Sequence, residues 1–189
     1  RYTTLCVLFE PLPAGDLLVL MRRFVRAGGR LIWSGPPPML TAEGNNAVEP
    51  WSKLFGAIHQ PSANLGLPLP GREIVFNGSL GSVPMQTILT DLPVDRVYQL
   101  EPASTAEVVA TCGGCIVGTH RVSPRGGSAT AFGFRPRDDQ SASLGSESRT
   151  WSVVLAVLGA YPSTDTFPGY NDNTEHLSRR SPYLCSRFP

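Results

Sequence analysis

The N-terminal part of the chain carries the pattern that most constrains the fold: a strand, an amphipathic helix and a second strand in immediate succession. The continuous apolar run at 5–9 is typical of a strand buried on both faces of a parallel sheet. From Asp16, which we expect at the N-cap, apolar residues recur at helical spacing as far as Val25. The glycine pair at 28–29 predicts the end of this helix, and 31–33 predicts a second buried strand. Because so short a crossover is normally right-handed and parallel, the unit predicts an α/β sheet domain.

The remainder of the chain predicts a second half rich in strands. Three prolines at 36–38 predict a long loop, and a short helix is expected to start with Pro50 as its first residue. The period then changes to that of strands, which we expect at 74–76, 83–89, 94–100, 108–110, 116–122 and 129–134. Glycine pairs at 113–114 and 126–127 predict hairpin turns, and a last helix is expected over 147–158. The predicted fold is therefore an α/β three-layer sandwich with a mixed, largely parallel sheet and antiparallel strands in its second half.

Length and composition bound the organisation of the protein. A chain of 189 residues suits one domain, which we place at 1–162, with 163–189 as a tail or linker to a further domain. Only 16% of the residues are charged, so we expect part of the surface to be covered by adjoining domains of the same polypeptide or by a homo-oligomer partner. The net charge is +1 and the basic residues are scattered, which argues against nucleic acid and membrane partners. The chain opens without an initiator methionine, and we expect it to be a fragment.

Cys112 and Cys115 form the most conspicuous motif, a C-x-x-C pair. Such a pair can be a redox dithiol or half of a metal site, but a redox pair needs a helix N-terminus to lower the pKa of its first thiol. Here the pair lies between two predicted strands, and a metal site would have to recruit His120 and Cys185 at no recognised spacing. We interpret the two cysteines as parts of a hairpin and keep the metal or redox clip as an alternative.

Ser34 stands where a nucleophile elbow would present a catalytic side chain. An elbow needs a helix directly after the nucleophile, and the prolines at 36–38 prevent one. We therefore predict no catalytic residue at this strand end, and the sequence predicts no cofactor.

A polar cluster follows the last predicted strand and is the candidate ligand site. It contains Arg135, Arg137, Asp138 and Asp139. Ligands of open α/β sheets bind at the carboxyl ends of strands, and guanidinium and carboxylate groups suit sugar hydroxyls or an anionic partner. The alternative is a solvated loop in which these arginines and aspartates pair with one another. We interpret His59 and His176 as surface residues.

Two segments together resemble a known family. They read FVRAGGRLIWSGP (24–36) and EVVATCGGCIVGTHRVSPRGGSATAFGFRP (107–136), the second standing before the final helix. This arrangement resembles the glutamine-amidotransferase-like (flavodoxin-like) domain that follows the catalytic barrel in many microbial beta-galactosidases, and it is similar to ThuA-like domains. The resemblance covers most of 1–162 and implies at least one more strand upstream of Arg1.

The chain departs from the working members of that class at the site of chemistry. A class I amidotransferase would show G-x-C-x-G at the elbow and a later His-x-Glu, whereas this chain has Ser34-Gly35-Pro36 and no such pair. Cys115 to Gly118 imitates the elbow but lies in a strand pattern. The resemblance therefore implies a non-catalytic domain of a larger carbohydrate-active, beta-galactosidase-like glycoside hydrolase, which helps it to oligomerise or lines its sugar site. An alternative from the enzyme class is a hydrolase that uses Asp138 or Asp139 with the nearby arginines, in the manner of a paired-carboxylate site.

Overall fold

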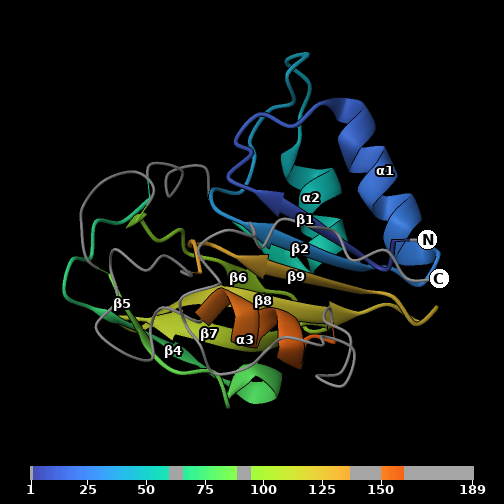
Figure 1. Cartoon of the computed structure of the whole chain (residues 1–189). Coiled ribbons are helices and arrows are strands. Elements are labelled where there is room, and N and C mark those ends of the chain that lie inside the picture. The colour runs from blue at the N-terminus through green and yellow to red at the C-terminus, as the bar shows by residue number, and fades with distance from the viewer. Residues whose placement is uncertain (1, 60–65, 89–94, 137–149, 160–189) are drawn as a thin grey trace, which may run out of the picture.

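The computed structural model describes residues 2–59, 66–88, 95–136 and 150–159 (Figure 1). In these residues a seven-stranded sheet has the strand order β1-β2-β9-β8-β7-β4-β5, and β3 and β6 form a second, two-stranded sheet. The strands are β1 (Thr4–Leu8), β2 (Arg30–Ser34), β3 (Ala57–Ile58), β4 (Glu73–Phe76), β5 (Gln86–Thr87), β6 (Glu101–Pro102), β7 (Glu107–Cys112), β8 (Cys115–Val122) and β9 (Ser128–Phe132). The helices are α1 (Gly15–Arg26), α2 (Val48–Phe55), α3 (Thr150–Val157) and the short 3-10 helix η2 (Gly78–Leu80).

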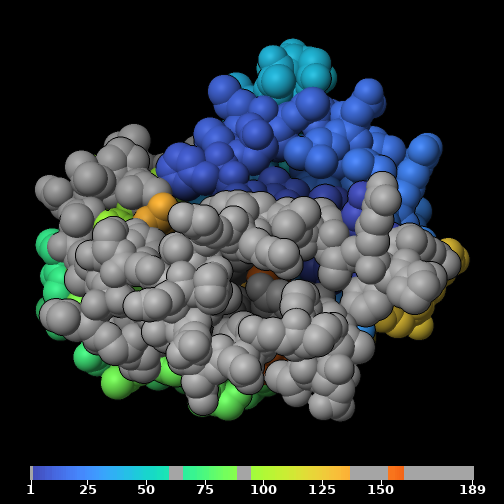
Figure 2. All heavy atoms as spheres, viewed as in Figure 1, coloured from blue at the N-terminus to red at the C-terminus, as the bar shows by residue number. Residues whose placement is uncertain are grey.

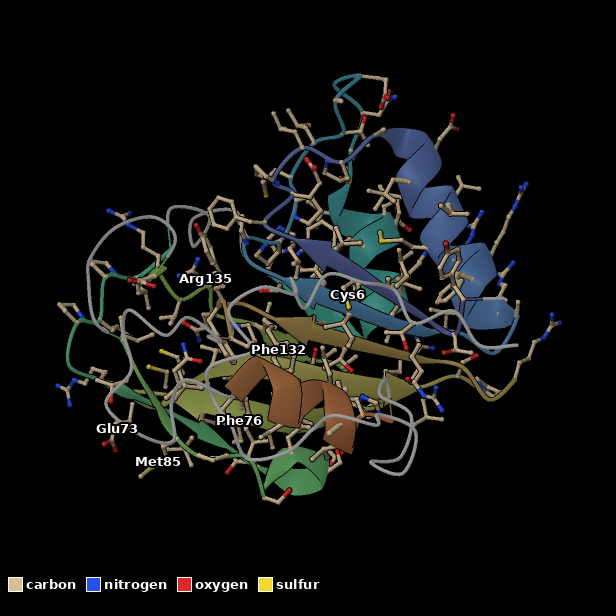
Figure 3. The ribbon with its side chains drawn as sticks, in the orientation of Figure 1. Cys6, Glu73, Phe76, Met85, Phe132 and Arg135 are labelled. Carbon is tan, nitrogen blue, oxygen red and sulfur yellow. The ribbon has the colours of Figure 1, made fainter. Side chains whose placement is uncertain are left out.

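The molecule has three layers, as the sequence predicts (Figure 1). The helices α1 and α2 cover one face of the sheet, and α3 lies on the other. Side chains alternate along β2: Leu31 and Trp33 pack into the core beneath α1 and α2, and Ile32 packs into the core that includes α3. Phe76 and Phe132 also belong to the α3 side (Figure 3). The space-filling view shows α1 and the loop before α2 forming the upper part of the molecule (Figure 2).

The sheet is mixed in the order that the sequence predicts. The first strands are parallel, because β1 pairs in parallel with β2 and β2 pairs in parallel with β9. The pairings of β9 with β8, β8 with β7, β7 with β4 and β4 with β5 are antiparallel. The predicted meander is thus β7-β8-β9, and β9 joins it to the parallel half.

Helix α1 ends as predicted but begins differently. Gly28 takes a φ of 91° just beyond the helix, and the amide of Gly29 donates to the carbonyl of Phe24 at 3.0 Å. At the other end, Ala14 and not Asp16 occupies the N-cap position. A carboxylate oxygen of Glu43 accepts a hydrogen bond from the amide of Gly15 at 3.0 Å, so the N-terminus is capped from a distant loop. Likewise α2 begins at Val48, two residues before the Pro50 start that the sequence suggests.

The strands predicted at 83–89 and 94–100 are largely wrong. Among the described residues of these segments, only Gln86–Thr87 forms a strand, and Val97 makes a single bridge to Leu67. Pro84 lacks an amide hydrogen and interrupts the first segment. The apolar residues that produced the strand pattern, such as Val83 and Val97, are still buried. In these segments the pattern therefore reflects the burial of side chains and not the pairing of strands.

Among the described residues, the first strand is buried on one face only. In the strand order β1 stands at one end, with Cys6 and Leu8 exposed and Val7 directed into the core beneath α1. The prediction of burial on both faces was therefore wrong, because it used the apolar run without knowledge of the strand order.

Two further expectations concern the C-terminal part. The predicted last helix appears as α3, with Val154 and Leu155 buried, while 147–149 and the predicted tail at 163–189 lie outside the described residues. Within the described segments, no helix has the length and apolar character needed to cross a bilayer.

Candidate functional site

The carboxyl ends of β2 and β9 meet at the position where ligands bind in open α/β sheets. Ser34 ends β2, is only 2% exposed, and donates its hydroxyl hydrogen to the carbonyl of Phe134 at 2.9 Å. The backbone is also bonded here: the amide of Gly35 donates to the carbonyl of Phe132 at 2.9 Å. Gly35 to Pro38 are all buried. The loop after β2 therefore closes this strand end instead of opening it as an elbow.

Arg135 lies at this end of the sheet, just beyond the end of β9 (Figure 3). A terminal nitrogen of its guanidinium group stands 4.0 Å from a carboxylate oxygen of Asp95, whose side chain is 7% exposed, whereas that of Arg135 is 41% exposed. The backbone carbonyl of Arg135 accepts a hydrogen bond of 3.0 Å from the side-chain amide of Gln86. A cation, a buried carboxylate and a buried amide are thus gathered at one strand end.

The predicted ligand cluster is placed only in part. Arg135 is at the carboxyl end of β9, as the sequence indicates, and it faces Asp95. Arg137, Asp138 and Asp139 lie outside the described residues. Sequence reasoning missed Asp95 and Gln86, because they are 40 and 49 residues from Arg135 and no local pattern links them to it.

This arrangement can recognise polar groups, and it contains no prepared nucleophile among the described residues. The guanidinium group of Arg135 retains hydrogen-bond donors, and its Nε is buried without a hydrogen-bond partner. A guanidinium group next to a carboxylate suits hydroxyl or carboxylate groups of a ligand or of an adjoining protein surface. The hydroxyl of Ser34, in contrast, has committed its proton to Phe134 and has no exposed face.

Cys112 and Cys115 occupy the predicted hairpin. They face each other in the register of β7 and β8, and Gly113 and Gly114 form the turn with φ angles of 55° and 84°. Burial raises the pKa of the Cys112 thiol, and the neighbouring Cys115 raises it further, which disfavours the thiolate needed for redox or metal chemistry. Within the segments described, no group of three or more Cys, His, Asp and Glu side chains could hold a metal ion.

Two histidines, His59 and His120, contact neighbouring side chains within the fold. His59 was predicted at the surface, but it is 3% exposed, with its Nε2 3.3 Å from the sulfur of Met39 and its ring edge-on to Trp51. His120, the weak metal candidate, is half-buried and its Nδ1 lies 2.8 Å from the hydroxyl oxygen of Thr130. The prediction for His59 was wrong because the apolar residues that cover it come from distant parts of the chain. His176 lies outside the described residues.

We expect the burial of these histidines to make the protein less stable in acid. Burial lowers the pKa of both His59 and His120 below the ordinary value, so the unfolded chain binds protons more readily than the folded chain. The contribution of these neutral histidines to stability is fully present above the ordinary pKa of about 6.5. It is lost as pH falls below that value towards the lowered pKa of the folded protein. Melting temperatures between pH about 7.5 and about 5.5 should fall for the wild type and fall less for His59→Phe. Parallel curves for the two proteins would show that His59 is not held neutral by burial.

The hydrogen bond of Ser34 predicts a structural effect of its removal. Ser34→Ala leaves the buried carbonyl of Phe134 without this donor and should lower the free energy of unfolding by about 1–2 kcal/mol in urea titrations. Ser82→Ala serves as the control, because Ser82 is exposed, and it should change stability by less than about 0.5 kcal/mol. Equal effects of the two substitutions would contradict the role given to Ser34.

Comparisons with known proteins give the fold and no sequence family. No family model and no curated sequence matches the chain. Solved structures with a similar fold include a cold-adapted beta-galactosidase from Rahnella sp. R3, with a TM-score of 0.63, 13% identity, and coverage of 84% of this chain and 23% of that chain. A GH42 beta-galactosidase from G. stearothermophilus has a TM-score of 0.62, 14% identity, and coverage of 86% and 22%. A cytoplasmic protein from Salmonella typhimurium has a TM-score of 0.58 and 13% identity, and the match covers 82% of this chain and 71% of that protein. The chain therefore spans less than a quarter of the two beta-galactosidases and shares its fold with a part of them.

Proposed function

We propose that this chain is a non-catalytic, glutamine-amidotransferase-like domain of a larger carbohydrate-active protein related to beta-galactosidases. In this role it supports the assembly of subunits or lines the sugar site of an adjoining catalytic domain. The proposal is supported by the shared fold with a part of two beta-galactosidases. It also agrees with the resemblance of 24–36 and 107–136 to such domains.

The observation that carries the non-catalytic role is the closed end of β2. A catalytic relative would present its nucleophile here at an elbow that enters a helix directly. In this chain Ser34 is buried and hydrogen-bonded to Phe134, and the next helix begins only at Val48. The hydroxyl thus lacks the exposure that a nucleophile needs, and its proton is already donated to a backbone carbonyl.

The edge at β1 supports a role in contact with another domain or subunit. Leu8 is 37% exposed and Phe9 is 40% exposed, and Leu12 in the following loop is 55% exposed. An edge strand that displays apolar side chains is a ready surface for association. We propose this edge, defined by Leu8, Phe9 and Leu12, as the contact surface for an adjoining domain or a second copy.

Arg135 and Asp95 support a role beside a sugar site. Their side chains gather at the strand end that carries ligands in related folds, and the exposed part of the guanidinium group can donate to hydroxyl groups. In the assembled protein they would line the catalytic site of the neighbour without taking part in bond cleavage.

Activity measurements on the purified chain test the non-catalytic role. We expect no release of nitrophenol from aryl galactosides and no hydrolysis of glutamine above the buffer rate. Turnover that disappears in Ser34→Ala or Asp95→Asn would overturn the proposal and would make this domain an enzyme in its own right.

Sedimentation equilibrium tests the contact surface on the same preparation. If β1 is a contact between copies, the chain should self-associate, and Leu8→Lys should weaken association. Val122→Lys is the matched control, because Val122 is 64% exposed on β8, away from this edge. A wild-type chain that stays monomeric would remove the oligomerisation role and leave only the contact with an adjoining domain.

A further inference from the structure

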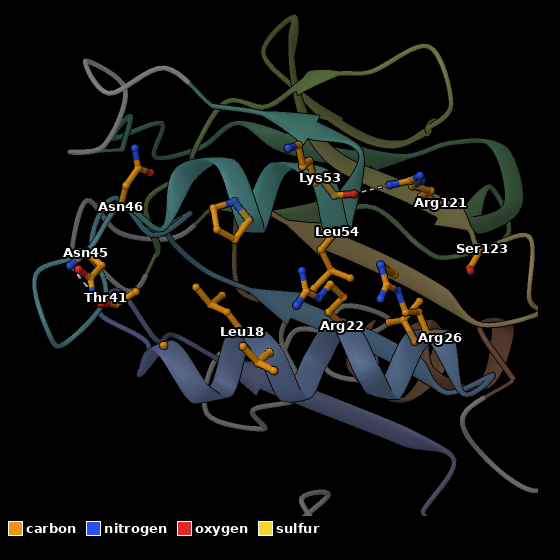
Figure 4. A pocket seen from close by; sticks show the side chains of 15 residues that line it. Leu18, Arg22, Arg26, Thr41, Asn45, Asn46, Lys53, Leu54, Arg121 and Ser123 are labelled. Atoms are coloured by element: carbon orange, nitrogen blue, oxygen red, sulfur yellow. Dashed lines mark hydrogen bonds between the residues drawn. The ribbon is translucent and has the colours of Figure 1, made fainter.

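A groove of about 480 Å³ runs between α1 and α2 and reaches the end of β8 (Figure 4). Its floor is apolar and includes Leu18 from α1 and Leu54 from α2. Ala129 near the start of β9 also lines it, whereas Arg135 follows the end of that strand. The groove is therefore separate from the candidate site described above.

Basic side chains converge on one end of this groove. Arg22 and Arg26 come from α1, one helical turn apart, and Arg121 comes from β8 (Figure 4). None of these three arginines forms an ion pair with a carboxylate of the described residues. Lys53 also lines the groove, but its charge is paired with Glu49 at 2.5 Å. Like charges that share a groove repel each other, and a bound anion would convert this repulsion into attraction.

A hydrogen bond to the backbone of Lys53 holds the Arg121 side chain in a position to bind such an anion. A terminal nitrogen of its guanidinium group donates to the backbone carbonyl of Lys53, which fixes the side chain against α2. The other donors of the planar guanidinium group remain for a ligand, and this geometry matches two oxygens of a phosphate or carboxylate.

The other end of the groove is lined by polar side chains without charge, and the Glu43 carboxylate lies next to it, where it accepts from the amide of the lining residue Gly15 at 3.0 Å. This end is formed by Thr41, Asn45 and Asn46, which lie beyond the first turn of α1 (Figure 4). The Asn46 side-chain oxygen accepts from the amide of Val48 at 2.8 Å, and the Thr41 hydroxyl oxygen accepts from the amide of Asn45 at 3.2 Å. These bonds hold the amide and hydroxyl groups in place, and such groups pair well with ligand hydroxyls.

We propose that this groove binds a small polyhydroxy compound that carries one oxyanion, such as a sugar phosphate or a sugar acid. The oxyanion lies among Arg22, Arg26 and Arg121, the apolar face of the ring lies on Leu18 and Leu54, and the hydroxyl groups reach the asparagine end. The volume falls within the range of about 300–1,000 Å³ that is usual for small-molecule sites.

Isothermal titration calorimetry of the whole chain tests this site with four probes: glucose 6-phosphate, glucuronate, glucose and inorganic phosphate. We expect at least one of the two charged sugars to bind, and glucose to bind too weakly to detect up to about 10 mM. The Arg22→Gln/Arg26→Gln variant should weaken binding by about tenfold or more. Arg23→Gln is the matched control, because Arg23 is exposed on the same helix and does not line the groove. Arg121 is left unchanged, since its bond to Lys53 also anchors α2.

Each outcome decides the proposal. Binding of glucose 6-phosphate identifies phosphate as the favoured oxyanion, and binding of glucuronate identifies carboxylate. Absence of binding by both, or equal binding by the double variant and the wild type, would overturn the site. Inorganic phosphate that binds as tightly as the sugar phosphate would overturn the role given to the asparagine end. All three substituted arginines are exposed on α1, so loss of binding should occur at an unchanged melting temperature.

Discussion

Replacing Trp33 by alanine is expected to lower the free energy of unfolding by about 3–5 kcal/mol, because it empties the centre of the core beneath α1 and α2. Trp33 is fully buried, and its ring packs edge-on against Trp51 and Phe55 at centroid distances of 5.9 and 6.1 Å. Its indole N–H donates to the carbonyl of Pro36 at 3.2 Å, so the same residue also fixes the loop after β2. Urea denaturation followed by circular dichroism measures the effect.

Two controls separate the packing of Trp33 from its hydrogen bond. Trp33→Phe keeps an aromatic ring but loses the bond to Pro36, and it should cost less than the alanine variant. Leu20→Ala lies on α1 with 53% of the side chain exposed and should change stability by less than about 0.5 kcal/mol. A Trp33→Ala protein as stable as Leu20→Ala would contradict the central place of this tryptophan.

Gly133→Ala is expected to destabilise the protein by about 3 kcal/mol or more, since a methyl group has no room beside the candidate site. A Cβ atom at this position would lie on the carbonyl oxygen of Tyr98. The two segments cannot separate easily, because the amide of Tyr98 donates to the carbonyl of Gly133 at 2.5 Å and the amide of Gly133 donates to Val117 at 2.7 Å. Thermal unfolding of the variant should show a large drop in melting temperature.

Gly126→Ala is the matched control for this prediction. Gly126 has a φ of 87° and open space around it, so alanine there suffers only backbone strain, about 1 kcal/mol. If Gly133→Ala were no more destabilising than Gly126→Ala, the close approach of Tyr98 and Gly133 would be refuted.

Local sequence patterns predicted the elements whose causes are local. The helix from 15 to 26 follows from apolar spacing and from the left-handed glycine at its end, and the hairpin at Gly113 and Gly114 follows from the turn chemistry of that pair. The parallel pairing of β1 with β2 follows from the short crossover between them. In each case the residues that determine the element stand within it or next to it.

The failures concern properties that depend on distant residues. The apolar residues around Val83 and Val97 gave a strand pattern, but they are buried under long-range packing and form few ladder bonds. The exposure of Cys6 follows from the place of β1 at the end of the strand order, and strand order is a property of the whole sheet. His59 is buried because Met39 and Trp51 cover it, and no pattern near His59 reports this.

The candidate site, too, was predictable only where its residues follow directly from local sequence patterns. Arg135 could be placed at a strand end from the β9 pattern, and Ser34 could be recognised as an unsuitable nucleophile from the prolines that follow it. Asp95 and Gln86 could not, because they reach Arg135 from a segment without regular strand structure. The groove arginines are also invisible in sequence, since Arg22 and Arg121 come to one groove only because α2 packs against both α1 and β8.

The non-catalytic role proposed for this chain depends on the closed strand end at Ser34, and a fluorophosphonate probe tests it most directly. Such probes form a covalent adduct with an activated serine hydroxyl, so intact-mass spectrometry of the treated chain reports whether Ser34 is a nucleophile. A hydroxyl that is 2% exposed and bonded to the carbonyl of Phe134 should remain unmodified while the protein is folded. A stoichiometric adduct that maps to Ser34 and is absent from Ser34→Ala would contradict the account and would restore catalysis to this strand end.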